Sequence, residues 1–458
     1  MLDGHPEVAQ VEFCVGGEGC IVGREVPGFG GGELAIVEIG DREAVVDLGE
    51  GVTAIHDLLG RACGGEVGRS FDPERMRLRE SHSMTDAMPA ELVSWIESAV
   101  GARVAFAKRA GEGASRQAYA VDVETGQGTL ELFCLRDNAS GSGGSMRDAG
   151  VLRALGATSI PVPRVHAASP ELGAILLTRV PGRGDFPHVD HDTEREPTAR
   201  DLMRLTAVLH ALDPAQLAID HLGEPAARQD HAALQLAHLS GLLRTLAADG
   251  LPLQRFAAGW LERRPPRASR TSLIHSDMGP GNFLYREGAV TAILDWEVAH
   301  WGDPMEDLAA IAVRDMATPI GSLATRYAEY TEAGGAPIEL AGIAWYRVYI
   351  LARNTSLIAL GLRRDLAPAD REPLARFQLL LLRALALCLC DVVGVERPGI
   401  EVGGAPPVPD TLEGRFADPV RERELARHFA REMQVQARTE ATRLGPFLDC
   451  FPQRLVAP

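Results

Sequence analysis

A polar loop between two apolar runs restricts most strongly what this chain can fold into. The segment Leu273–Tyr285 holds the loop and the apolar run on each side of it, and a further strand, Val290–Trp296, follows after the turn Arg286–Gly288. The glycines and proline of Gly279–Gly281 predict a turn, so a hairpin would bring the polar residues to one edge. Phosphoryl transfer needs such a set: one carboxylate for the proton of the attacking hydroxyl, and oxygen ligands that hold Mg²⁺ against the phosphates. The residues concerned are His275, Asp277, Asn282 and Asp295.

The spacing of these residues has a known counterpart. The pattern H-x-D-x-x-x-x-N, followed about a dozen residues later by I-L-D-W-E, resembles the aminoglycoside phosphotransferase and choline kinase family, relatives of the protein kinases. The run His300–Ala309 fits the same family. The alternative, a surface hairpin with polar tips, stays open at this point.

That resemblance implies a fold and a set of roles. The fold would be α+β and two-lobed like a protein kinase, with a small antiparallel-sheet N-lobe and a mostly helical C-lobe. Asp277 and His275 would be the catalytic residues, while Asn282 and Asp295 would bind Mg²⁺. His275 would also brace the loop together with Asp307.

Earlier strands predict the nucleotide site. The segments Val104–Lys108 and Gln117–Val123 are typical of strands, and the glycine-bearing turn between them lets backbone N–H groups approach phosphates. By resemblance this turn would cover the nucleotide, although an ordinary hairpin turn fits equally well. Ile175–Val180 predicts a buried strand that leads to the hinge between the lobes. The residues expected to bind ATP here are Gly111, Gly113, Ser115, Arg179 and Val180.

The family also places a basic residue at the end of the third strand, where it contacts phosphates and pairs with a carboxylate on the next helix. Here Arg136 ends the strand Thr129–Leu135, and Asp148 lies where the carboxylate is expected. An Arg–Asp pair can do the same electrostatic work as the Lys–Glu pair of the protein kinases, and arginine offers the better fork for phosphate. Whether it replaces that pair here stays open, because aspartate is one methylene shorter than glutamate. Arg136 could instead be a solvated strand end, which keeps a non-catalytic nucleotide-binding protein open.

The chain divides into four predicted parts. Residues 1–83 form an appendage of unknown role, in which Leu34–Ile39 and Glu43–Leu48 predict two strands of a hairpin. The N-lobe spans 84–183, the C-lobe 184–395, and a helical tail 396–458. His210 ends a predicted helix of the C-lobe, where it either packs on the lobe or touches substrate.

Composition excludes several classes of protein. The formal net charge of −17 argues against a nucleic-acid binder. Seven scattered cysteines are typical of reduced thiols in a cytoplasmic protein, and the first residues lack a signal-peptide pattern. Phe377–Val393 is apolar but carries Arg383 and Asp391, so it predicts a core helix, and no membrane interaction is expected.

The sequence therefore predicts an ATP- and Mg²⁺-dependent phosphotransferase that acts on a hydroxyl of a small molecule. Three short phrases also resemble the kinase modules attached to acyl-CoA dehydrogenases, which favours a hydroxyacyl-CoA as acceptor. An aminoglycoside phosphotransferase and a non-catalytic scaffold are the alternatives, and the oligomeric state stays open. The phrases are the L-R strand end at Leu135-Arg136, the I-P-V-P run at Ile160–Pro163 and L-H-A-L-D at Leu209–Asp213.

Overall fold

The computed structural model divides the chain into two units, Met1–Ala87 and Met88–Pro458. In the first unit it describes the backbone of residues 10–15, 19–27, 33–39 and 42–47. In the second it describes residues 88–112, 116–138, 144–186, 193–246 without 218 and 220, 251–364, 366, 368–396 and 423–431, with backbone alone at 111–112 and 368–370. The first division thus falls between residues 87 and 88, whereas the predicted one falls between 83 and 84. The other predicted boundaries remain predictions.

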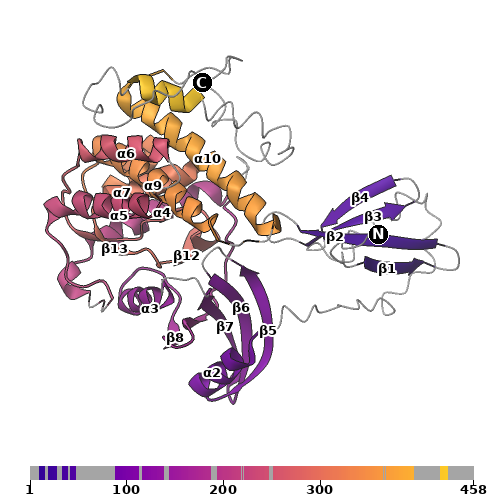
Figure 1. Cartoon of the computed structure of the whole chain (residues 1–458). Helices are drawn as coiled ribbons and strands as arrows, with labels where there is room; N and C mark the ends of the chain where they lie inside the picture. The colour runs from indigo at the N-terminus through magenta and orange to yellow at the C-terminus, as the bar shows by residue number, and fades with distance from the viewer. Residues whose placement is uncertain are drawn as a thin grey trace. The chain divides into compact units, whose positions relative to one another are not determined.

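The described part of the first unit is an antiparallel sheet of four strands (Figure 1). The strands follow one another in the order of the sequence, and Ile39 of the third strand pairs with Arg42 of the fourth. The hairpin predicted around residues 40–41 is therefore confirmed. The strands are β1 (Gln10–Val15), β2 (Gly19–Pro27), β3 (Glu33–Ile39) and β4 (Arg42–Asp47).

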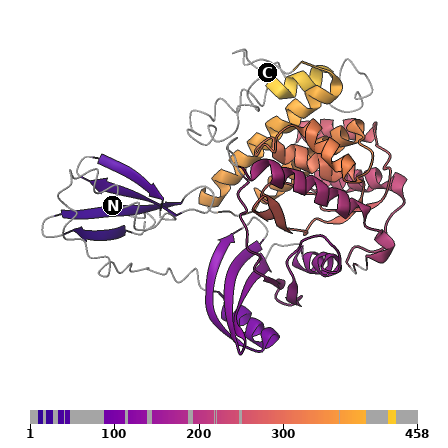
Figure 2. The ribbon, with the colours of Figure 1, turned by 180° about the vertical axis from the view of Figure 1, so that it is seen from behind.

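The second unit begins with a small lobe built on a five-stranded antiparallel sheet in the order β5-β6-β7-β9-β8. One face of this sheet packs on helix α2 (Ala90–Val100), whose Leu92 and Ile96 are fully buried. Helix α3 (Gly144–Leu155) contacts β7, β8 and β9 (Figure 2). The strands are β5 (Arg103–Glu112), β6 (Arg116–Thr125), β7 (Gly128–Asp137), β8 (Val165–Ser169) and β9 (Ala174–Thr178).

Side chains of β7 alternate between the two faces of the sheet, as the two-residue period of a strand requires. Leu132 and Cys134 are buried against α2 in the core of the small lobe. Phe133 and Leu135 face the other way and line a cavity. This alternation later decides which of two arginines reaches the site.

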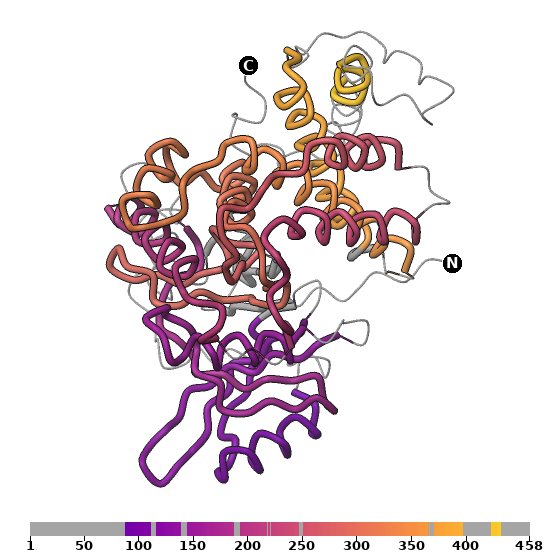
Figure 3. Tube along the Cα trace, turned by 90° about the vertical axis from the view of Figure 1, so that its left-hand side faces the viewer, coloured from indigo at the N-terminus to yellow at the C-terminus, as the bar shows by residue number. Residues whose placement is uncertain are grey.

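The large lobe is mostly helical, and Figure 3 traces the chain from the sheet into it. Helix α9 lies at its centre, because α5, α6, α7 and α10 all pack on it. No described helix is long and apolar enough to cross a membrane. The helices are α4 (Arg195–Ala211), α5 (His231–Thr245), α6 (Pro252–Glu262), α7 (Met305–Asp315), α8 (Leu323–Glu332), α9 (Leu340–Gly361) and α10 (Pro368–Val393), with a further helix at 423–431.

Two small strand pairs in the large lobe carry the candidate site. Strand β10 (Ser272–Ile274) pairs with β13 (His300–Gly302), and β11 (Phe283–Arg286) pairs with β12 (Ala289–Ile293). The turn of the second pair has φ values of 53° at Glu287 and 77° at Gly288. Two positive φ values in a two-residue turn match the right-handed twist of the strands. The predicted hairpin is confirmed. Because β11 and β12 are paired, the loop that precedes β11 lies close to the loop that follows β12.

Candidate active site

A buried carboxylate fixes the loop after β10. Asp307 on α7 is fully buried and accepts hydrogen bonds from the backbone N–H groups of His275 (3.0 Å) and Ser276 (2.7 Å) and from Nε2 of His210 (3.0 Å). Burial alone would raise the pKa of Asp307, but these donors lower it below its ordinary value. They also hold Ser276 at a φ of 67°, which is strained for a residue with a side chain. Asp307 is therefore a charged brace, and His210 packs inside the lobe and supports it.

His275 ties this loop to the end of β12. Its Nδ1 accepts the backbone N–H of Asp277 at 3.2 Å, and its Nε2 donates to the carbonyl oxygen of Leu294 at 2.7 Å. The imidazole packs on Trp296 with ring centroids 4.6 Å apart. These contacts place His275, which the sequence pairs with Asp277 as catalytic, between the loop after β10 and the end of β12.

The carboxylate of Asp277 is held by an arginine that the sequence did not single out. Arg314, near the end of α7, donates from Nε to Oδ1 (3.0 Å) and from Nη2 to Oδ2 (2.5 Å). Burial acts to raise the pKa of Asp277, but Arg314 outweighs it and the pKa is lowered. The fit requires Gly279, since a Cβ there would lie 2.9 Å from Cδ of Arg314. Asp277 thus stays ionised and fixed in orientation.

Asn282 and Asp295, the predicted metal ligands, lie on adjoining loops, since the backbone N–H of Leu294 donates to the backbone oxygen of Asn282 at 2.8 Å. Nδ2 of Asn282 donates to the backbone oxygen (2.8 Å) and to Oδ2 (2.9 Å) of Asp277, so its amide oxygen is the atom able to face a cation. Asp295 follows β12 with a φ of 65°, and its side chain is 44 % exposed. Among the described residues, no group of three or more His, Cys, Asp or Glu forms a metal cage. One amide and one carboxylate oxygen nevertheless suit Mg²⁺, which takes few protein ligands beside phosphate oxygens.

A cavity of about 410 Å³ joins these residues to the small lobe. Asn282 and Asp295 line one side, and the predicted hinge residues Arg179 and Val180 line another. Arg179 turns its guanidinium to Asp122 (2.5 Å) and Glu131 (2.8 Å). The remaining lining is largely apolar: Ala118, Phe133, Leu135, Leu152, Pro163, Leu177, Leu284 and Leu294, together with Arg116, Asp148, Thr178, Gly182 and Gly281.

The predicted turn over the phosphates is only partly within the described residues. Gly111 lies on β5, where it pairs with Ala118 of β6. Gly113 and Ser115 lie outside the described residues.

The predicted pair of Arg136 and Asp148 is wrong. Nη2 of Arg136 donates to Oε1 of Glu91 on α2 at 2.6 Å, and Arg136 is absent from the described lining of the cavity. The reason is the alternation of β7: Leu135 faces the cavity, so its neighbour must face α2. Asp148 instead accepts from Nη1 of Arg116 at 2.5 Å. The period of the strand could have placed Arg136 on the outer face, but nothing local in the sequence predicts the partner of Asp148.

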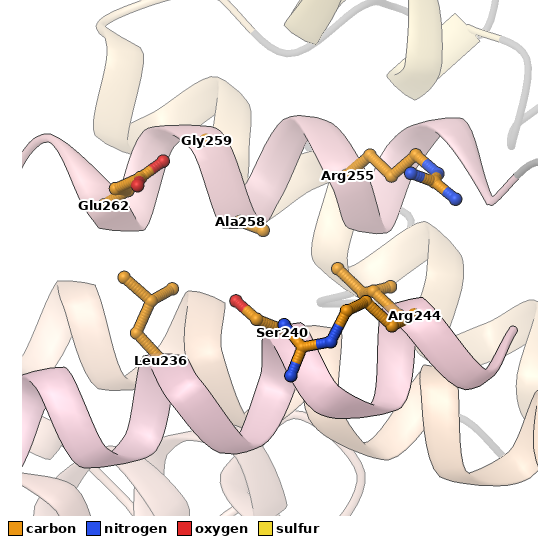
Figure 4. Close-up of a pocket in the computed structure, with 8 residues that line it drawn as sticks. Leu236, Ser240, Arg244, Arg255, Ala258, Gly259 and Glu262 are labelled. Atoms are coloured by element: carbon orange, nitrogen blue, oxygen red, sulfur yellow. The ribbon is translucent and has the colours of Figure 1, made fainter. Parts of the chain in front are cut away.

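A second hollow of about 370 Å³ lies between α5 and α6 (Figure 4). Ser240 and Arg244 extend from one helix, and Arg255 and Glu262 from the other. None of its lining residues belongs to the catalytic loop or to the larger cavity, so the candidate active site is built on the larger cavity alone.

The model of the phosphotransferase enzyme family matches residues 107–349, more than half of the 458 residues. The chain belongs to this family. The matched range contains the cavity, the catalytic loop and the brace on α7. The two-lobed, protein-kinase-like α+β fold is therefore confirmed, with the small sheet and the helical lobe as its two parts.

Individual proteins that are similar to this chain match it at low identity. Acyl-CoA dehydrogenase family member 10 of Mus musculus is 25 % identical over 174 residues, which cover 36 % of this chain and 16 % of that protein. Family member 11 of Rattus norvegicus is 27 % identical over 179 residues, 36 % of this chain and 22 % of that protein. The match thus spans less than a quarter of either relative. The macrolide 2'-phosphotransferase of Brachybacterium faecium is 19 % identical, with a TM-score of 0.46 over 62 % of this chain and 96 % of that one.

Proposed function

We propose that this phosphotransferase moves the γ-phosphoryl group of ATP to a hydroxyl group of a small metabolite. The observation that carries the proposal is that Asn282 and Asp295 line one cavity, and that Asn282 donates to the carboxylate of Asp277 at 2.9 Å. The same cavity is lined by Arg179 and Val180 of the predicted hinge, which would give the adenine a place beside their backbone groups. Apolar side chains from both lobes line the space between and would enclose the ring.

Asp277 would orient the attacking hydroxyl. A carboxylate whose pKa is lowered is a weak base, so Asp277 serves best as a hydrogen-bond acceptor that fixes the direction of attack. Arg314 and His275 hold its carboxylate and backbone in place. Most of the rate would then come from placement and electrostatics.

Asn282 and Asp295 would hold Mg²⁺, which supplies positive charge to the phosphate oxygens when it is bound. A backbone hydrogen bond links the segments that carry the two residues: the N–H of Leu294, which precedes Asp295, donates to the backbone oxygen of Asn282 at 2.8 Å. That bond joins the backbones of the two loops that carry the amide and the carboxylate.

The acceptor is better matched by an anion than by a cation. The charges of Arg314 and Arg353 both act on Asp277. Arg353 lies beside the loop, because its Nη1 donates to Oγ of Ser276 at 2.7 Å. The charges of Arg353, His300 and Arg147 act on His238, and that of Glu306 opposes them. An acceptor bearing phosphate or carboxylate groups, such as a hydroxyacyl-CoA, suits this surrounding, whereas a polycationic aminoglycoside does not. The names of the two acyl-CoA dehydrogenase relatives agree with that choice.

A non-catalytic nucleotide-binding role is the alternative, and one observation favours it. Arg314 bonds to both carboxylate oxygens of Asp277. If that pair does not yield to a substrate hydroxyl, the site would bind nucleotide without transferring phosphate.

The test is incubation with radiolabelled ATP and Mg²⁺ and a panel of acceptors: hydroxyacyl-CoA thioesters, the free hydroxy acids and aminoglycosides. We expect label on an anionic acceptor, and none with the Asp277→Asn variant. Label on aminoglycosides alone would overturn the acceptor class. Binding of ATP measured by calorimetry, without transfer to any acceptor or to water, would favour the non-catalytic role, and the lack of binding would reject the proposal.

A further inference from the structure

We propose that Arg116, the first residue of β6, binds the phosphates of the nucleotide, and that Asp148 positions it. The inference rests on the proposed function and names a residue that neither the motif nor the family comparison points to. The proposed phosphate-binding cation is therefore on β6, whereas the sequence predicted Arg136 on β7.

Arg116 lies where such a cation is needed. It lines the cavity together with Asp295 and Asn282, yet its side chain is only 6 % exposed. Its guanidinium donates to Oδ1 of Asp295 (2.9 Å) and to Oε2 of Glu297 (2.9 Å). It also directly follows residues 113–115, the end of the turn predicted to cover the phosphates. An arginine fork suits phosphate oxygens as well as it suits carboxylates.

The three carboxylates around Arg116 differ in how firmly they are held. Asp148 is 1 % exposed, accepts from Nη1 at 2.5 Å and receives the backbone N–H of Trp296 at 3.1 Å on its other oxygen. The side chain of Asp295 is 44 % exposed and that of Glu297 25 %. Asp148 is therefore the fixed anchor of the guanidinium, and the two exposed carboxylates are the partners that phosphate oxygens could replace.

Charge balance links this cation to the metal ligand. One guanidinium faces three carboxylates, so the group keeps an excess of negative charge at the edge of the cavity. A divalent cation and Arg116 must share Asp295. Removing the guanidinium should then strengthen the binding of a divalent cation and weaken the binding of phosphates, and these opposite signs distinguish a binding residue from a structural one.

Arg136 provides the matched comparison. It is an arginine on the neighbouring strand with one carboxylate partner, Glu91, but it lies on the face of the sheet that packs on α2. The Arg136→Gln variant removes the same charge from the same lobe without touching the cavity.

The test has two readouts: calorimetric binding of ADP in EDTA, and binding of Mn²⁺ without nucleotide, followed by electron paramagnetic resonance. We expect Arg116→Gln to bind ADP about 10-fold or more weakly, the loss of one charge-assisted hydrogen bond, and to bind Mn²⁺ more tightly. Arg116→Lys should keep most of the ADP affinity, and Arg136→Gln should match the wild type in both measurements.

Loss of Arg116 leaves Asp148 buried without a cation, so the double variant Arg116→Gln/Asp148→Asn guards against misfolding. It should bind ADP as weakly as the single variant. Equal losses of ADP and Mn²⁺ binding, or a loss of ADP binding in Arg136→Gln but not in Arg116→Gln, would overturn the inference while the proposed function stands. Failure of the wild type to bind ADP or Mg²⁺·ATP would overturn both.

Discussion

The two sides of the cavity were built in different ways. On the large lobe, Asp277, Asn282 and Asp295 come from one short stretch and meet through a hairpin. On the small lobe, Arg116 reaches Asp148 across 32 positions and Asp295 across 179. The difference shows that a site formed by residues close in the sequence can be predicted from their spacing, whereas a site formed by side chains from distant elements cannot.

The largest expected effect belongs to the large lobe. Asp277→Asn removes the acceptor for the substrate hydroxyl, and we expect kcat to fall by about 10³-fold or more. The measurement is phosphate transfer from labelled ATP, with nucleotide binding as the control. Full activity in this variant would contradict the proposed role of Asp277 in phosphoryl transfer.

The brace beneath the loop comes next. Asp307→Ala leaves three donors without their buried acceptor, and we expect the free energy of unfolding to fall by about 3–5 kcal/mol in urea titrations. The exposed Asp185→Ala should change it by less than about 0.5 kcal/mol. Because the folded pKa of Asp307 is lowered, its contribution is present at neutral pH and is lost as the pH falls through that pKa.

A smaller effect on stability is expected from Asp303, a buried carboxylate that precedes α7. Burial raises the pKa of Asp303 to about 6, and Glu306 and Glu339 add to this. The folded state then binds a proton at Asp303 more tightly than the unfolded state, so the contribution of Asp303 to stability should decrease as the pH rises from about 4 to 6. Asp303→Asn should remove that slope and be more stable than the wild type at pH 7.5, by at most about 3 kcal/mol. An unchanged slope in urea titrations across this range would contradict the shift.

Arg314 sharpens the comparison within the large lobe. Replacing it with glutamine should lower kcat by about 10-fold, because Asp277 loses its orientation. Arg314 lowers the pKa of Asp277, so its removal should move the acid limb of the kcat–pH profile to higher pH. Arg314→Lys should restore part of that shift. A faster Arg314→Gln enzyme would show that the pair inhibits the site.

The smallest effect lies on the outer face of the small lobe. The pair of Arg136 and Glu91 is solvent-exposed, with the Glu91 side chain 55 % exposed, so Glu91→Gln should change stability by less than about 1 kcal/mol. Nucleotide binding should stay at the wild-type value. A clear loss of ADP affinity in the Glu91→Gln variant, measured by calorimetry, would show that the pair of Arg136 and Glu91 contributes to nucleotide binding.

Much of the fold was predictable for the same reason as the catalytic loop. The turn at Glu287-Gly288 and the apolar runs beside it fix the hairpin of β11 and β12, and the helical spacing in Phe377–Val393 predicts the core helix α10. The partners of these elements were not predictable. Arg314 looks like an ordinary helix-end cation in the sequence, and nothing near Asp148 in the sequence predicts that its partner is Arg116.

The sequence by itself determined the chemistry on offer: a carboxylate, an amide and a second carboxylate at a spacing that a hairpin brings together. Backbone geometry within a few residues suffices for that. The tertiary structure alone decided which cations face these groups, because Arg116, Arg314 and Asp148 meet the loop through packing between separate elements. Electrostatic partners depend on distance in space, and distance in space between remote segments is a property of the folded chain.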